Sequence, residues 1–203
     1  MEWTSRDWVE ELNYQEFLSA WPRGKRTLFG LTMDDTDLAM GRGDWLFIDY
    51  VLSQNKTLHR SVELGTFRGV TSLYLGICMA LRGGGTTTID NVGVVPDKVL
   101  GAWNYFGYPH IDFVQCDVLK DVYKVGRLIG PKTLLVCDNG EKDTEAQLYA
   151  PFIVGDSIML VHDKDIEYDS ESLAIKIASL GLSEVYQDIA SDLSSTFMAF
   201  RRK

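Results

Sequence analysis

The sequence of 203 residues predicts an α/β fold, in which a doubly wound parallel sheet carries helices on both faces. A short strand breaks at Gly65 and continues as a largely apolar helix from Val70. Short β-branched or apolar runs then alternate with helical patterns, and a nearly continuous apolar run such as Thr133–Cys137 indicates a strand covered on both faces. Regular alternation of this kind is typical of strands that pair in parallel through crossover helices.

The predicted elements follow one another in a simple order. After a first strand near Arg60, we expect a helix over Val70–Leu81, a strand over Thr86–Ile89, a helix over Pro96–Phe106, a strand over Ile111–Cys116, a helix over Leu119–Leu128, a strand over Thr133–Cys137, a helix over Asp143–Phe152, a strand over Ser157–Val161, a helix over Ser170–Leu180 and a closing antiparallel hairpin of Glu184–Ile189 with Ser195–Arg201. The expected sheet therefore has seven strands.

Residues 1–56 precede this repeat and form a predicted N-terminal helical extension, while residues 57–203 form the ligand-binding domain. Apolar residues between Thr4 and Trp21 have helical spacing, Arg26–Gly43 is expected to be loop, and Asp44 is expected to cap a helix that stops near Asn55. We expect the extension to act as a lid over the acceptor side of a site, with a dimer contact or plain core packing as the alternative.

The glycine turn has the spacing E-x-G-x-x-x-G, formed by Glu63, Gly65 and Gly69. A dinucleotide site would instead have G-x-G-x-x-G. An acid two residues before the first glycine would repel a pyrophosphate but could hold a cationic amino group, such as that of S-adenosylmethionine (SAM). The alternative is a buried strand-turn-helix without a ligand. Asp90, about 20 residues beyond the turn, suits the ribose hydroxyls of a nucleoside, and a helix cap is its alternative.

The amino-acid composition restricts the classes of binding partner and the cellular location that we expect. The net charge of −9 disfavours nucleic acid or an anionic membrane. Three cysteines without paired spacing favour reduced core thiols. The first residues lack a basic start with an apolar run, and no apolar stretch is long enough to span a bilayer. We therefore expect a soluble, cytoplasmic protein, and a homo-oligomer stays open.

The order of elements over about Arg60–Arg201, with the glycine turn and acids at the strand ends, resembles the class I SAM-dependent methyltransferases and their Rossmann-like sheet. Val136–Asp138, Leu148–Pro151 and Gly155–Asp163 are similar to the small-molecule O-methyltransferase branch that includes cephalosporin hydroxylase-like and macrolide-sugar methyltransferases. The resemblance implies SAM as the methyl donor and, in many members, a magnesium ion.

The resemblance also implies roles for single residues. The implied cofactor-binding residues are Glu63, Gly65, Thr66, Phe67, Gly69, Asp90, Asn91, Asp117 and Asp138. Among them, Asp90 would bind the ribose and Asp117 the adenine edge. The resemblance implies that Asp138 and Asp163 face the metal and the acceptor, with both as metal ligands. The predicted catalytic residues are these two acids and two candidate bases that the residues themselves suggest, Lys142 and His162.

Asp138 and Asp163 follow neighbouring strands of the predicted sheet, so their carboxylates can converge and bind a hard cation. The alternative is that Asp138 only caps a loop or touches SAM. For the general base, His162 and Lys142 are both candidates, although alternation along a strand would direct His162 away from Asp163 unless the strand has already ended. His162 and Lys164 flank the final acid, where metal-dependent members carry another oxygen ligand.

The predicted function is methyl transfer from SAM to a hydroxyl of a small molecule, such as a sugar, a natural product or a phenol. Two alternatives stay open: a methyltransferase that acts on a macromolecule, and a noncatalytic SAM- or nucleotide-binding protein. The acceptor, the metal requirement, the base and the oligomeric state are not determined by the sequence.

Overall fold

The computed structural model describes residues 25–28, 31–34, 40–92 and 111–203, together with positions 95, 97, 100 and 103. Its main sheet has seven strands in the order β5-β4-β3-β6-β7-β9-β8. The strands are β3 (Arg60–Leu64), β4 (Gly85–Asp90), β5 (Ile111–Gln115), β6 (Thr133–Cys137), β7 (Ile158–Val161), β8 (Leu182–Val185) and β9 (Met198–Arg202). The helices are α4 (Arg42–Gln54), α5 (Val70–Ala80), α7 (Val122–Gly126), α8 (Lys142–Tyr149), α9 (Ser170–Ser179) and α10 (Gln187–Asp192), with a 3-10 turn over Ala150–Phe152.

Five strands of this sheet pair in parallel, and β9 runs antiparallel to both β7 and β8. The central strand β3 pairs with β4 on one side and β6 on the other, which places Glu63 between Thr88 and Val136. Crossover helices place the carboxyl ends of the parallel strands at one edge of the sheet. The predicted doubly wound α/β sheet with an antiparallel C-terminal pair is confirmed.

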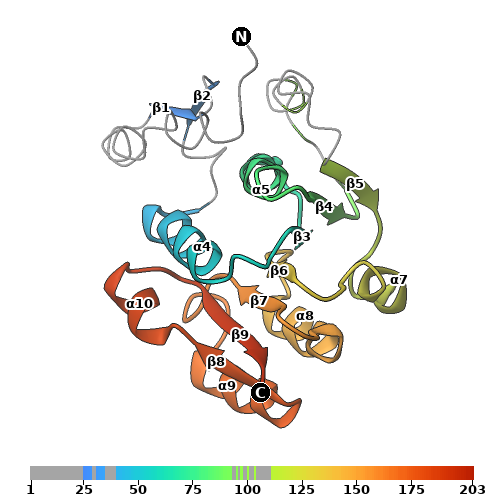
Figure 1. Ribbon diagram of the computed structural model, residues 1–203, viewed down its shortest axis with the longest axis vertical. Coiled ribbons are helices and arrows are strands. Elements are labelled where there is room, and N and C mark those ends of the chain that lie inside the picture. The colour runs from blue at the N-terminus through green and yellow to red at the C-terminus, as the bar shows by residue number, and fades with distance from the viewer. Residues whose placement is uncertain are drawn as a thin grey trace.

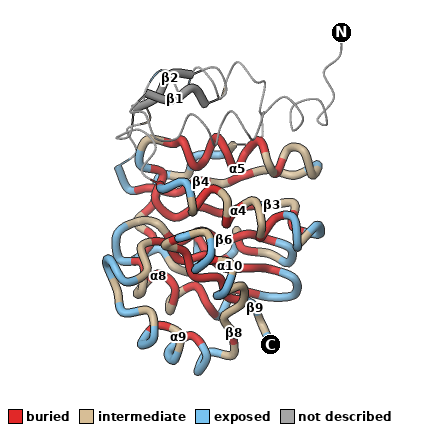
Figure 2. Tube along the Cα trace, turned by 90° about the vertical axis from the view of Figure 1, so that its left-hand side faces the viewer, coloured by how far each residue is buried: buried red, intermediate tan, exposed pale blue. Residues whose placement is uncertain are grey.

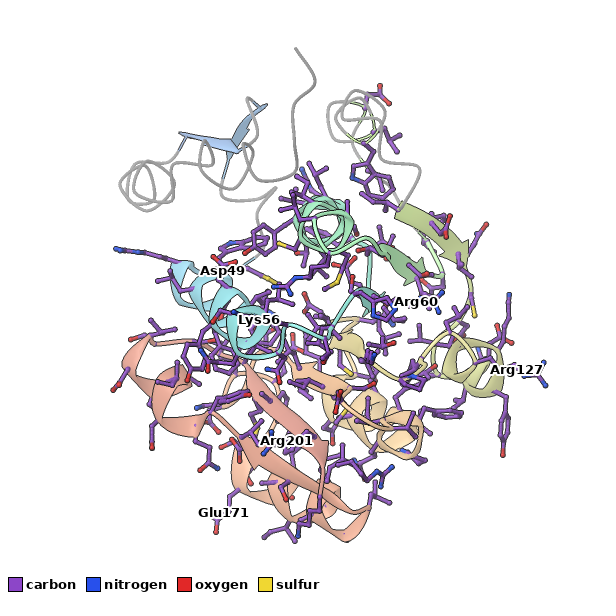
Figure 3. The ribbon with its side chains drawn as sticks, viewed as in Figure 1. Asp49, Lys56, Arg60, Arg127, Glu171 and Arg201 are labelled. Atoms are coloured by element: carbon purple, nitrogen blue, oxygen red, sulfur yellow. The ribbon has the colours of Figure 1, made fainter. Side chains whose placement is uncertain are left out.

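Helices cover both faces of the sheet (Figure 1), and a hydrophobic layer lies on each face. The first contains Trp45 and Phe47 of α4 packed with α5 and α10 residues, and the second contains Tyr149 of α8 and Leu173 of α9. The strands β3, β4, β6 and β7 and helix α5 are largely buried, while α9 exposes its outer side (Figure 2). Charged side chains such as Arg127 and Glu171 lie on the outside of the helical layers (Figure 3).

The C-terminal connection differs from the predicted hairpin. β8 ends at Val185, and α10 separates it from β9. Ile189 and Ala190 of this helix pack into the hydrophobic layer that contains α4. The stretch Glu184–Ile189 has only six residues, so the spacing of its apolar residues does not distinguish a strand from a helix. Packing of Ile189 and Ala190 against the rest of the fold favours the helix.

Three further boundaries differ from the prediction. The expected loop Arg26–Gly43 contains two antiparallel strands, β1 (Lys25–Leu28) and β2 (Leu31–Asp34). Helix α4 starts at Arg42, earlier than expected, although Asp44 does cap it, because its carboxylate in the first turn accepts the Gly41 N–H at 2.9 Å. Helix α7 covers only part of 119–128, because Asp117 accepts the N–H groups of Leu119 and Lys120 in a turn before it.

The predicted helices within Thr4–Trp21 and Pro96–Phe106 lie outside the described ranges, apart from single positions of the second. Within residues 1–56, side chains are described only from Met40 onward, and α4 packs directly on the sheet domain. The lid role of the preceding residues stays a prediction. No helix in the described ranges has the length and apolar character needed to cross a bilayer.

Candidate functional site

A cleft of about 990 Å³ opens at the carboxyl ends of β3, β4, β6 and β7. Eight residues predicted from the sequence line it, namely Gly65, Phe67, Asp90, Asn91, Asp138, Lys142, His162 and Asp163. This edge is where doubly wound sheets bind their ligands. Glu63, Thr66, Gly69 and Asp117, which were also predicted to bind the cofactor, are not among the cleft-lining residues.

The glycine turn after β3 is held against the end of β6. Gly65 has φ +94°, and a Cβ atom there would lie 2.3 Å from the carbonyl oxygen of Asp138. The Gly65 N–H donates to Ile89 O at 2.8 Å, and the Asp138 N–H donates to Leu64 O at 2.9 Å. Glycine is therefore required at position 65 for two reasons, the positive φ of the turn and the close approach of its backbone to Asp138.

Asp90 holds the same turn from the other side. One carboxylate oxygen accepts the N–H groups of Thr66 and Phe67, both at 3.0 Å, and the other accepts the Val92 N–H at 2.9 Å. This supporting role was missed in the sequence, where Asp90 was expected only to bind ribose or cap a helix. Because each carboxylate oxygen has more than one lone pair, the ribose contact is compatible with these bonds and stays a prediction.

Glu63 lies behind the turn. It is 1% exposed, and its carboxyl accepts hydrogen bonds from the hydroxyls of Ser72 and of Thr88, the latter at 2.6 Å. Burial raises the pKa of Glu63 to about 8 despite these two bonds. Its predicted contact with an amino group stays untested, and the structure shows it as a buried link between β3, β4 and α5.

The remaining predicted cofactor residues have partners within the protein. Gly69 begins α5 with φ +73°, and a Cβ there would lie 2.9 Å from the Trp103 side chain. The Thr66 hydroxyl lies 2.7 Å from that of Thr88. Asp117 is bonded to the Lys120 ammonium at 2.6 Å, and its role at the adenine edge remains a prediction.

The other end of the cleft holds a cluster of charges, which we call the charge cluster: Asp44, Asp138, Lys142, His162, Asp163 and Glu167. Lys142 Nζ lies 2.7 Å from a Glu167 oxygen, 2.9 Å from Asp163 and 3.6 Å from Asp138. His162 Nδ1 lies 3.0 Å from Asp138 and 3.4 Å from Asp163. The two candidate bases thus bring together the two predicted metal ligands.

His162 and Asp163 face the same neighbours because β7 has already ended at Val161. Asp163 has φ +60°, a left-handed conformation that breaks the alternation of a strand. The backbone N–H of His162 still donates to Cys137 O at 3.2 Å, which keeps the residue beside the end of β6. The strand has thus ended before His162, which is the condition under which alternation was not expected to separate the two side chains.

Asp44 is the member of the cluster that sequence reasoning missed. It is 3% exposed, and one oxygen accepts the Ser195 hydroxyl at 2.9 Å and the Thr196 N–H at 2.7 Å. Its other oxygen lies 3.5 Å from His162 Nε2. The available signal is an acid directly before the apolar run that starts at Trp45, a position that also predicts a helix cap.

The carboxylates keep both bases protonated. Burial lowers the pKa of His162, but hydrogen bonds with Asp138, Asp163 and Asp44 raise it to about 11. Burial likewise opposes the charge of Lys142, and its bonds to Glu167 and Asp163 raise its pKa above the ordinary value. His162 lowers the pKa of Asp163 to about 2 against the effect of burial, with help from Lys142. At neutral pH the cluster contains two cations among four acids.

The predicted magnesium site does not fit this arrangement. Ligand atoms of Asp138, His162 and Asp163 lie within 4.8 Å of one another, a spacing that a metal ion could bridge. However, magnesium binds carboxylate oxygens at about 2.0–2.1 Å. The Lys142 ammonium already lies between the oxygens of Asp163 and Glu167, and imidazolium hydrogen bonds occupy Asp138. A divalent ion would have to displace these groups.

Solved structures of methyltransferases resemble this fold. A putative methyltransferase from Escherichia coli superposes with a TM-score of 0.55 at 11% identity, covering 80% of this chain and 86% of its own. The chain has the fold of a class I SAM-dependent methyltransferase. No protein-family model and no curated protein sequence matches it.

Two other methyltransferase structures match more weakly. A putative caffeoyl-CoA O-methyltransferase from Staphylococcus aureus has a TM-score of 0.50 at 12% identity and covers 95% of this chain and 90% of its own. A SAM-dependent methyltransferase from Agrobacterium tumefaciens has a TM-score of 0.50 at 12% identity and covers 79% of this chain. The chain spans 62% of the length of that last protein. At these identities the likeness establishes the fold.

Proposed function

We propose that the protein is a SAM-dependent methyltransferase that acts on a hydroxyl group of a small molecule. The observation that carries the proposal is a single cleft, in a sheet of methyltransferase order, with the glycine turn at one end and the charge cluster at the other. The first end suits a nucleoside with an amino acid tail, and the second suits a polar acceptor.

The cofactor half is formed by the turn and the end of β4. Gly65 brings backbone close to the cleft, while the exposed ring of Phe67, with 56% exposure, offers an apolar face. Asp90 and Asn91 supply polar groups at the end of β4, where a ribose is expected. The residues therefore fit SAM, which when bound would supply an electrophilic methyl group on its sulfonium sulfur.

In the acceptor half, Lys142 can donate a hydrogen bond to the acceptor, while His162 contributes positive charge and directs its two N–H groups to Asp138 and Asp44. Lys142 and His162 are held protonated, so at neutral pH they stabilise negative charge on an acceptor oxygen and do not remove its proton. Asp138, which also lines the cleft, can accept that proton or pass it to water. The cluster thus orients the hydroxyl and increases its acidity, and positioning supplies much of the remaining rate enhancement.

A small acceptor agrees with the charge and size of the site. The cleft volume of about 990 Å³ would be shared by SAM and its acceptor. Four carboxylates in the cluster and a net charge of −9 oppose the approach of a polyanion. These features favour a small hydroxyl compound over a nucleic-acid acceptor.

Isothermal titration calorimetry with S-adenosylhomocysteine and with NAD tests the cofactor assignment. We expect S-adenosylhomocysteine to bind and NAD to bind more weakly. Asp90→Ala should weaken binding by about 1–3 kcal/mol, because the turn loses its support. Asp156→Ala, an exposed acid outside this cleft, is the matched control and should bind like the wild type. Tighter binding of NAD would refute the assignment.

The acceptor class is tested by transfer of a labelled methyl group from SAM to panels of sugars, phenols and hydroxylated natural products, with bulk RNA and protein as parallel acceptors. We expect label in small hydroxyl compounds. Label that appears only in a macromolecule would overturn the acceptor class. Binding of SAM without transfer to any panel would instead support the noncatalytic alternative.

A further inference from the structure

Lys142 occupies an unusual position. It is the first residue of α8, yet its side chain is only 5% exposed. The amino end of a helix carries partial positive charge, so a buried ammonium there is unfavourable unless acids compensate it. Asp163 and Glu167 supply that compensation at 2.9 and 2.7 Å. The chain therefore holds a positive charge at the point where the strand-end acids converge.

Among the residues that the structure describes, two acids lie at ordinary hydrogen-bond distance from this ammonium. An ammonium has three N–H groups. Two have partners at ordinary hydrogen-bond distance in Asp163 and Glu167, whereas Asp138 at 3.6 Å is too far for a good hydrogen bond. Because Lys142 lines the cleft, one N–H can be donated to an oxygen of a bound molecule. A metal ion in this position would make the same contact by coordination.

From this geometry we propose that Lys142 is a built-in substitute for a divalent cation, which binds the acceptor oxygen and makes the site independent of metal. The proposal rests on the proposed function for the identity of the bound molecule. The positive charge is fixed by Asp163 and Glu167, and His162 supplies a second one between Asp138 and Asp44. The matching ligand class is a hydroxyl that loses its proton readily or lies beside an anionic oxygen, because two cations face it.

Manganese binding tests, independently of activity, whether Lys142 takes the place of a metal ion. The proposal predicts that the wild type binds no stoichiometric Mn²⁺ in an electron paramagnetic resonance titration. Lys142→Met removes the charge, keeps an unbranched side chain, and frees Asp163 and Glu167 from the ammonium, while Asp138 keeps its contact with His162. This variant should gain one Mn²⁺ site at least roughly tenfold tighter than any wild-type binding, since three carboxylates then face one point.

Two further variants control for nonspecific effects. Lys142→Arg keeps the positive charge and should not gain the site. Adding Asp163→Asn to Lys142→Met should remove the gained site, because it removes a central carboxylate. The wild-type titration needs no substitution, so the proposal remains falsifiable where Lys142→Met does not fold.

The proposal is overturned if the wild type binds one Mn²⁺ that Asp163→Asn abolishes. It is equally overturned if folded Lys142→Met gains no site, since the acids would then not be arranged for a cation. Failure of the proposed function has a different signature. In that case the wild type would not bind S-adenosylhomocysteine, whereas the manganese results would be unaffected.

Discussion

Substitution of Glu63 by glutamine tests whether the buried Glu63 carboxyl stays protonated in the folded protein. Glu63 lies on β3 between Thr88 and Val136 and is 1% exposed. Burial raises its pKa from 4.5 to about 8, although the hydroxyls of Ser72 and Thr88 donate to its carboxyl. The folded chain therefore keeps a proton that the unfolded chain loses above about pH 4.5.

The sign of the pH dependence follows from this difference. Stability falls as pH rises wherever the folded state binds more protons than the unfolded state. For Glu63 the window extends from about 4.5 to about 8, and its contribution is constant above that. Between pH 5 and 7.5 the loss amounts to about 3 kcal/mol. Glu63→Gln cannot titrate, so it should lack this part of the decline.

Urea unfolding at several pH values measures the effect. The free energy of unfolding of Glu63→Gln relative to the wild type should increase by about 3 kcal/mol from pH 5 to 7.5. Glu171→Gln, an exposed position in the first turn of α9, is the matched control and should follow the wild type. Parallel curves for Glu63→Gln and the wild type would show that Glu63 is ionised in the folded protein and refute the argument.

Three other substitutions test the turn and the charge cluster. Asp44→Ala should lower the free energy of unfolding by about 2–4 kcal/mol in urea, because the Thr196 N–H and Ser195 hydroxyl lose their acceptor in a buried place; a loss below about 0.5 kcal/mol would contradict this. Gly65→Ala should abolish binding of S-adenosylhomocysteine in calorimetry, because the new Cβ would lie 2.3 Å from the carbonyl oxygen of Asp138. Gly83→Ala is the control and should retain binding, because Gly83 also has a positive φ but lies in open space. Phe67→Ala should change the free energy of unfolding by less than about 1 kcal/mol, since the ring is 56% exposed. The same variant should bind S-adenosylhomocysteine several-fold more weakly. Unchanged affinity would place the cofactor away from this ring.

The path of the chain was predictable because its signals are local. Strand and helix periods, together with Gly65 and the acids that end the strands, are properties of short stretches of sequence. They specified the parallel sheet, the glycine turn and the edge where the cleft opens. They failed where a stretch was short, as at Glu184–Ile189, because packing against α4 selected a helix there.

The partners of the site residues depended on the tertiary structure. Asp44 and His162 are 118 positions apart, and they meet only because α4 packs beside the ends of β7 and β9. Lys142 and Glu167 are 25 positions apart, and they become partners because α8 starts where the loop after β7 returns. Such pairs depend on loop paths and on competition among many hydrogen-bond partners, which no periodicity encodes.

The sequence by itself thus determined that Asp138 and Asp163 end neighbouring strands, and hence that they converge. Only the tertiary structure decided what lies between them, because a left-handed turn at Asp163 directs His162 and Asp163 to the same neighbours. The ammonium of Lys142 completes the arrangement from the start of α8. Charge balance at a buried point is a property of all the groups that surround it, and those groups are set by the fold.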